Sequence, residues 1–249
     1  LRATVKVVVG DILRLLAAHA VKRGSCKSNP TSHSAVRFRL SATDGPPPQT
    51  AVTELVRTTR LWDLMQKDPY LKLHMEGCLG DGAGGTSAQM RSRPGINIEG
   101  IAVTGGRLYA RFRGPSEDGF VPILSVDAQT LFEGGNAEPK LDRLPVGTRI
   151  GIRDMAAANN SILLLLGPDD HEAGAEAVWT VAEWTPGTTA PPRPLASLDI
   201  RRKDIGDACF QAIKPEAIAM LEESASTFRV VVLSDGVCDG GPLIFDLAR

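Results

Sequence analysis

The sequence has almost no excess of either charge and no long apolar run. Its 249 residues include 28 Lys and Arg against 29 Asp and Glu, for a formal net charge of −1. Proteins that bind nucleic acid by attracting phosphates carry a basic excess, so this composition argues against a nucleic-acid partner. The longest apolar segment, Val5–Val21, is interrupted by Asp11 and Arg14 and lacks the ~20 apolar residues that a membrane-spanning helix needs. We therefore expect neither a membrane span nor a clear signal peptide.

Familiar catalytic and cofactor motifs are also missing. The sequence has no G-x-S-x-G motif, which excludes an α/β-hydrolase, because that fold places its nucleophile there. The glycine clusters at Gly82–Gly85 and Gly134–Gly135 do not lie between a strand and a helix, as a phosphate-binding loop must. The histidines are scattered without the spacing of metal ligands: His19, His33, His74 and His171. No motif of these kinds assigns a reaction.

What the sequence does contain is a repeated pattern of short strands. The clearest copy is Ile96–Pro115, where two apolar strands flank a Gly105–Gly106 turn. Weaker copies follow at Ile150–Pro168 and Ile213–Gly236. Each copy has an acidic residue before a small or apolar strand, and a second apolar strand that ends in Gly-Pro or Asp-Gly. A period near ~50 residues in an all-β pattern is typical of propeller blades, and the 25 Gly and 17 Pro indicate many turns.

We therefore predict an all-β fold, a β-propeller of about four blade-like units in a ring that can be incomplete. The units are residues 1–65, 96–145, 150–200 and 213–247, with a loop at 75–95 and one short surface helix near 61–68. The last unit is one strand short. Its fourth strand is expected from the other end of the chain, either Val5–Val9 or a segment preceding Leu1. A β-sandwich is the alternative, although its turns should recur every ~8–12 residues.

Five segments, in order, resemble one bacterial family. They are KRGSCKSNPTSHSAVRFRL, NIEGIAVTGGRLYARFRGP, GIRDMAA, KPEAIAML and VVVLSDGVCDGGP. The chain from about His19 onward is similar to the family filed as domain of unknown function 3616, which in turn is similar to the esterase-like phytase propellers. Members of that family carry further blades upstream, so the resemblance implies an N-terminally shortened chain. Members of the family have a Gly-Ser pair before the histidine. This sequence departs from that pattern, because Ala17–Ala18 precede His19.

The candidate site lies where the innermost strands of a propeller begin. Glu99, Asp154 and Glu216 are the acids of the three copies, spaced 154 − 99 = 55 and 216 − 154 = 62 residues apart. Several carboxylates around one axis can hold calcium or another divalent cation, which can activate water for hydrolysis. In the alternative, each acid pairs with a nearby basic side chain. Strand alternation would send Arg153 to the opposite face from Asp154 and leave Lys214 better placed.

Further ligand contacts are expected around these acids. We assign a ligand-binding role to the polar residues near the strand starts and to the acid at the end of the last copy: Asn97, Arg111, Arg113, Arg153, Lys214 and Asp235. Arg111 and Arg113 can bind a phosphate group or pair with the acids.

The four cysteines form an even set. Cys209 precedes the first strand of the last unit and Cys238 follows its second strand, so antiparallel pairing would bring them within disulfide reach. Cys26 and Cys78 would be the other pair. Disulfides place the protein in the periplasm or outside the cell, and free thiols place it in the cytoplasm.

Two functions remain open. The first is a hydrolase of a small phosphorylated or carboxylic-ester substrate, in which the carboxylates act as metal ligands or general bases. The second is a non-catalytic propeller that binds a small ligand or a partner protein, since such scaffolds host many functions.

Overall fold

The described residues of the protein form four antiparallel sheets, each with its strands in chain order. The computed structural model describes residues 3–9, 12–21, 27, 29–43, 49–75, 77, 95–168, 178–200 and 214–249, without the side chains of residues 3–9, 42–43, 49–50 and 113. The first sheet contains β1 (Ala3–Val9), β2 (Ile12–Ala17), β3 (Ala35–Thr43) and β4 (Gln49–Thr58). The second contains β5 (Asn97–Thr104), β6 (Arg107–Gly114), β7 (Phe120–Asp127) and β8 (Lys140–Pro145). The third contains β9 (Ile150–Ala157), β10 (Ile162–Pro168), β11 (Thr180–Trp184) and β12 (Arg193–Ser197), and the fourth β13 (Lys214–Glu223), β14 (Thr227–Asp235) and β15 (Leu243–Ala248).

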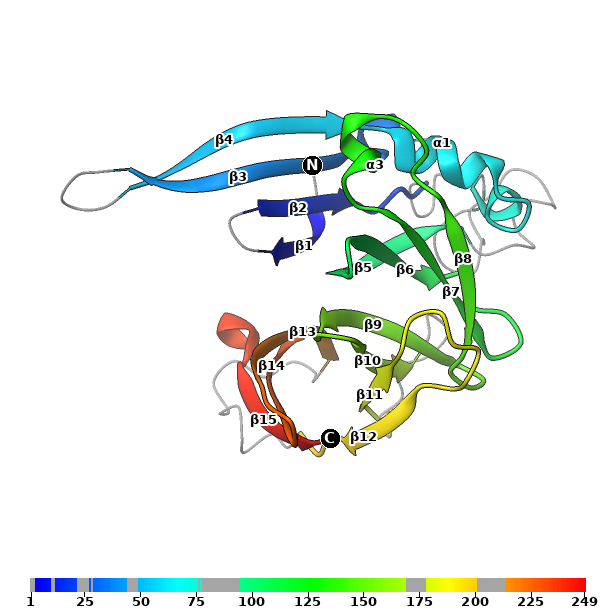
Figure 1. Ribbon diagram of the computed structural model, residues 1–249. Coiled ribbons are helices and arrows are strands. Elements are labelled where there is room, and N and C mark those ends of the chain that lie inside the picture. The colour runs from blue at the N-terminus through cyan, green and yellow to red at the C-terminus, as the bar shows by residue number, and fades with distance from the viewer. Residues whose placement is uncertain are drawn as a thin grey trace.

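The sheets follow one another as the blades of a propeller do. The first strand of each sheet contacts the first strand of the next, so β1, β5, β9 and β13 are the innermost strands of the arc in Figure 1. This confirms the predicted all-β, propeller-like fold. One expectation is wrong: Val5–Val9 does not complete the last sheet, because β1 pairs with β2 in the first sheet. In the described part of the chain, the fourth sheet has three strands.

Local sequence explains why these segments form strands. The Gly105–Gly106 turn joins β5 to β6 with φ values of 55° and 75°, a region that glycine enters without strain. The apolar run Ile162–Leu166 is buried on both faces, because β10 lies inside its sheet with other sheets packed on either side. Ile12–Ala17, whose pattern is also compatible with a helix, forms β2.

Short helices lie at the edges of the sheets. The predicted surface helix is α1 (Arg60–Lys67), which ends just before Pro69 because the residue preceding a proline avoids the helical region. The described part of the chain also contains α3 (Thr130–Glu133) and the 3₁₀ helices η1 (Pro30–Ser32), η2 (Leu71–His74) and η5 (Cys238–Gly240). Among the described residues, no helix is long and apolar enough to cross a membrane.

The core is divided among the interfaces between sheets. One cluster joins the first and second sheets with α1, and includes Leu61 and Phe112. The second lies between the second and third sheets, where Tyr109 packs edge-on against Trp184 at 5.9 Å between ring centroids. The third cluster joins the third and fourth sheets. Each sheet is thus held by the apolar faces of its neighbours, as the blade prediction implies.

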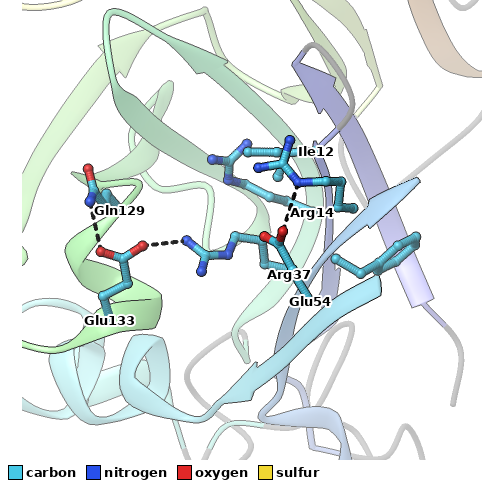
Figure 2. A pocket seen from close by; sticks show the side chains of 8 residues that line it. Ile12, Arg14, Arg37, Glu54, Gln129 and Glu133 are labelled. Carbon is cyan, nitrogen blue, oxygen red and sulfur yellow. Dashed lines mark hydrogen bonds and ion pairs between the residues drawn. The ribbon is translucent and has the colours of Figure 1, made fainter. Parts of the chain in front are cut away.

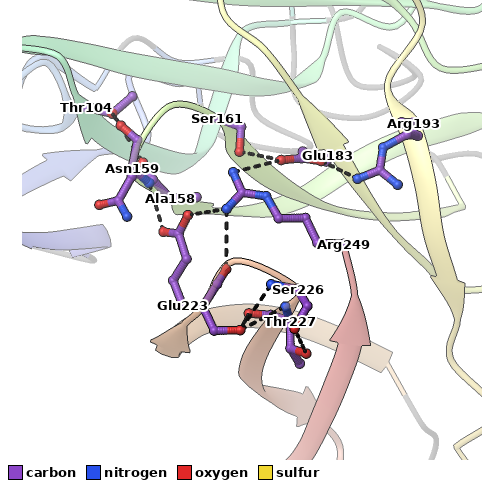
Figure 3. Close-up of polar contacts among 11 residues, drawn as sticks. Thr104, Ala158, Asn159, Ser161, Glu183, Arg193, Glu223, Ser226, Thr227 and Arg249 are labelled. Atoms are coloured by element: carbon purple, nitrogen blue, oxygen red, sulfur yellow. Dashed lines mark hydrogen bonds and ion pairs between the residues drawn. The ribbon is translucent and has the colours of Figure 1, made fainter.

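A polar network adds to the contact between the third and fourth sheets (Figure 3). Arg249 at the end of the chain forms ion pairs with Glu223 at 3.0 Å and with Glu183 at 3.9 Å. Glu183 accepts a hydrogen bond from the Ser161 hydroxyl at 2.7 Å and also contacts Arg193. The last strand is therefore tied to the third sheet by charge as well as by apolar packing.

Candidate functional site

Each of the last three innermost strands carries a β-bulge close to its start. In β5 the bulged residue is Glu99, because Ile98 pairs with Phe112 and Gly100 with Arg111. The same irregularity leaves Arg153 unpaired in β9 and Glu216 unpaired in β13. A bulge inserts one residue that opposes no partner and redirects its side chain. Three charged side chains are therefore presented at equivalent places in three successive sheets.

This register corrects the repeat alignment that the sequence suggested. Glu99 and Glu216 are equivalent, but the residue of β9 at that position is Arg153 and not Asp154. Asp154 corresponds instead to Gly100 and Ala217, one residue further along. The three acids therefore do not form one equivalent set, and an arginine stands in the middle copy.

Arg111 lies at the centre of this group. Its side chain is fully buried, and its Nη2 lies 3.9 Å from Glu99 Oε2. The side chain passes over Gly100, where a Cβ would lie 2.7 Å from Arg111 Cγ, so only glycine leaves room for it. Burial lowers the pKa of Arg111 to about 10, and the negative charges of Glu99 and Asp154 offset part of that shift. Its three guanidinium nitrogens have no hydrogen-bond partner among the residues described here.

Arg153 is the second buried cation of the cluster. Its Nη2 forms an ion pair with Glu216, and its Nη1 donates a hydrogen bond to the Pro168 carbonyl at 3.1 Å. The guanidinium also lies over the Trp179 ring at 5.5 Å, a favourable cation–π geometry. Strand alternation was expected to turn Arg153 away from Asp154 and leave Lys214 better placed to pair with an acid. Arg153 pairs instead with Glu216 of the neighbouring sheet, and Lys214 is exposed.

Asp154, the residue that follows Arg153, connects β9 to β13. Its Oδ2 accepts a hydrogen bond from the Ile218 backbone N–H at 2.9 Å. Burial raises the pKa of Asp154 from its ordinary value of 3.8 to about 6, although hydrogen bonds from Ile218 and Met155 and the charge of Arg111 oppose the shift. Because this pKa lies near neutrality, Asp154 can both accept and release a proton under physiological conditions.

The other candidate residues differ in where the structure places them. Asn97 is buried and donates a hydrogen bond to Glu99 Oε1 at 2.5 Å, so it belongs to the cluster. Lys214 and Asp235 are exposed and oppose each other across β13 and β14. Arg113 lies in β6, and its side chain is outside the described residues.

The structure places basic side chains beside two of the carboxylates that are predicted to bind a metal. Within the described ranges, no group of three His, Cys, Asp or Glu side chains could hold an ion. The carboxylates of Glu99 and Glu216 contact Arg111 and Arg153. Calcium binding at Glu99, Asp154 and Glu216 stays a prediction.

The cysteine pairing is only partly visible. Cys238 is disulfide-bonded. Cys26, Cys78 and Cys209 lie outside the described residues. The pairing of Cys238 with Cys209, and that of Cys26 with Cys78, remain predictions.

Sequence reasoning missed two further groups of polar residues. His19 and His33 meet at 6.4 Å between ring centroids, and His33 stacks on Trp62 at 3.4 Å. Burial lowers the pKa of His19 to about 4, so this ring is neutral at physiological pH. The second group consists of Arg14, Arg37 and Arg39, which lie beside the first sheet. Contacts between residues far apart in sequence create both, although the basic alternation of V-R-F-R-L was a signal for the second.

Comparisons with known proteins give a family and no activity. No curated protein matches the sequence. Among solved structures, a GH43 endo-arabinanase from Bacillus licheniformis aligns with 97% of this chain and 92% of its own, at 10% sequence identity and a TM-score of 0.32. A family model matches residues 48–239, well over half of the chain. The chain therefore belongs to the family described as "Protein of unknown function (DUF3616)", the one that its sequence segments resemble.

Proposed function

We propose that the protein hydrolyses a small carboxylic ester at the cluster around Arg111. The observation that carries this proposal is the position of Arg111. Its guanidinium is buried, has no hydrogen-bond partner among the described residues, and is influenced electrostatically by Asp154, whose pKa is about 6. Hydrogen-bond donors held in place away from water are suited to stabilise negative charge that develops on a carbonyl oxygen.

The roles of the residues follow from their charges. Asp154 takes a proton from water as the water oxygen attacks the ester carbonyl, and Arg111 stabilises the resulting oxyanion. The ester C–O bond then breaks, and Asp154 returns the proton to the leaving alkoxide. Arg153, fixed by Glu216 and Trp179, limits the net negative charge of the cluster.

The charge of the cluster favours a neutral ester over a phosphate ester. Glu99, Asp154 and Glu216 supply three negative charges when ionised, against two positive charges from Arg111 and Arg153. A dianionic phosphate ester would be repelled by the excess negative charge, whereas a carboxylic ester carries none before water attacks it.

The test is hydrolysis of p-nitrophenyl acetate, with p-nitrophenyl phosphate as the comparison substrate. Asp154→Asn should lower kcat at least ~100-fold, and should abolish the rise of kcat/KM with pH that we expect near pH 6. Asp246→Asn is the control, because Asp246 is an exposed acid of β15 outside the cluster. An Asp154→Asn variant with unchanged kcat would contradict the proposal.

The alternative is a non-catalytic propeller that binds a ligand or a partner. In this alternative Arg111 serves only to balance the charges of the carboxylates around it and contacts no substrate. In that case neither ester is hydrolysed by the wild-type protein.

We also propose that the protein functions in the periplasm or outside the cell. The disulfide bond of Cys238 supports this location, because such bonds persist in oxidising compartments. Mass spectrometry of the protein isolated from its native cells, alkylated before lysis, would test it. Cys238 recovered as an alkylated thiol would contradict this location.

A further inference from the structure

A small cavity lies beside the first sheet, away from the inner-strand cluster. It has a volume of about 280 Å³ and is bounded by β2, β3, β4 and the α3 segment of the second sheet (Figure 2). Three arginines line it, Arg14, Arg37 and Arg39, together with Glu54 and Glu133. Full ionisation of these side chains gives the lining an excess of one positive charge.

Strand register places the arginines on one face. Arg14 of β2 lies directly opposite Arg37 of β3, and Ile12 lies opposite Arg39. Arg37 and Arg39 both line the cavity, although the pairing of β3 with β4 is irregular between them. Like charges directly opposite each other destabilise a sheet. The pairing of Arg14 with Arg37 therefore costs stability unless negative charge lies between them.

The carboxylates of the cavity are already engaged. Glu133 forms an ion pair with Arg37 at 3.0 Å and accepts a hydrogen bond from Gln129 at 2.7 Å. Glu54 contacts Arg39 Nε at 3.2 Å, and does so from a backbone φ of 51°, a left-handed conformation that residues other than glycine rarely adopt. Both acids are thus committed to Arg37 and Arg39.

Among the described residues, Arg14 has no such acidic partner. It is 8% exposed, and its Nε and Nη1 have no hydrogen-bond partner within the described part of the chain. Burial, and after it the charge of Arg37, lower the pKa of Arg14. A buried cation with unused donors, facing a second cation across a cavity, is an unfavourable arrangement that a bound anion would relieve.

We propose that this cavity binds a phosphate group, free or as a small phosphate monoester, between Arg14 and Arg37. The guanidinium group presents paired N–H donors that match two oxygens of a phosphate, and the Arg14 side chain lines the cavity. The volume suits a group of this size and not a long chain. The site is separate from the ester-hydrolysing cluster, and neither proposal depends on the other.

The test is calorimetric titration of the whole protein with inorganic phosphate, at an ionic strength held constant with sodium chloride. Wild type should bind one phosphate, and Arg14→Gln should weaken binding at least about tenfold. Arg14→Lys keeps the charge but loses the paired donors, so it should fall between the two. The same titration with glycerol 1-phosphate distinguishes a monoester from free phosphate by which of the two binds more tightly.

Two controls separate this site from the rest of the protein. Arg229→Gln removes an exposed arginine of β14 that lies 3.8 Å from Asp246, and should leave phosphate binding unchanged. Arg111→Gln, shown by circular dichroism to be folded because loss of Arg111 is destabilising, should also bind phosphate as wild type does, so this test does not depend on ester hydrolysis. Circular dichroism of Arg14→Gln and Arg14→Lys establishes that both fold. Phosphate binding of equal strength in wild type and folded Arg14→Gln, or no binding by wild type, would overturn the proposal.

Discussion

Arg111 and Arg14 are two buried arginines in opposite electrostatic settings. Both have guanidinium nitrogens without a hydrogen-bond partner among the described residues. Arg111 lies among carboxylates of three successive sheets, which oppose the effect of burial on its charge. Arg14 faces Arg37, which adds to the effect of burial. The first arginine is therefore balanced by the protein itself, whereas the second needs an anion from outside.

The largest expected effect is that of Arg111→Met. This change leaves Glu99 and Asp154 without their shared cation, and loss of one partner of a buried charge group typically costs about 3–5 kcal/mol. Urea unfolding at pH 7 measures the loss. Adding Glu99→Gln should recover part of it, and a double variant no more stable than Arg111→Met would show that charge balance is not the reason.

The second prediction concerns the pH dependence of Asp154. Its folded pKa of about 6 lies above the ordinary value of 3.8, so the folded state holds this proton more tightly. The wild-type free energy of unfolding gains from this group at low pH, and loses on the order of 2 kcal/mol as the pH rises from about 4 to about 6.

Asp154→Asn cannot ionise and should not show this loss. The stability of Asp154→Asn relative to wild type should therefore rise across this range and stay level above it, as urea unfolding at a series of pH values would show. The difference in free energy of unfolding between the two proteins removes the contributions of the other carboxylates, which both proteins share. Asp235→Asn serves as the exposed control, and a difference that is constant from pH 4 to pH 7 would contradict the raised pKa.

A smaller effect is expected from Gly100→Ala. The added Cβ would lie 2.7 Å from Cγ and Nε of Arg111, so that side chain must shift. We expect a loss of roughly 1–2 kcal/mol. In an Arg111→Ala background the clash is gone, and the alanine should be neutral or slightly stabilising. Equal losses in both backgrounds would mean that Gly100 is required for another reason.

The smallest expected effect is that of calcium. Because Arg111 and Arg153 already contact Glu99 and Glu216, we expect millimolar calcium to raise the melting temperature no more than sodium chloride of equal ionic strength. A calcium-specific rise that disappears in Glu99→Gln would instead support the divalent-cation prediction.

The sequence predicted the blades better than it predicted the site. Strand period and turn residues located the units from Ile96 onward, because apolar alternation and glycine turns are local properties. The equivalence of Glu99 and Glu216 could also be read from the sequence. The sequence did not show that Arg153 occupies the same position in β9 as these two acids do in their strands. A bulge changes which face a residue occupies and leaves no clear mark in the sequence.

Pairing between segments far apart in the sequence explains what else could not be predicted. The segment Ile12–Ala17 could be a helix or a strand on its apolar pattern, and only its pairing with β1 and β3 decides. For that reason Arg14 was not recognised as a neighbour of Arg37. The same holds for His19 and His33, which the sequence separates and the first sheet brings together.

The contrast between the two arginines is tested most directly by Arg14→Met, measured by urea unfolding in phosphate-free buffer. Methionine keeps the apolar stem of the side chain and removes the charge that faces Arg37. We predict a variant at least as stable as wild type. A loss of about 3 kcal/mol or more, as expected for Arg111→Met, would show that the protein already holds Arg14 by internal partners, and would contradict the account.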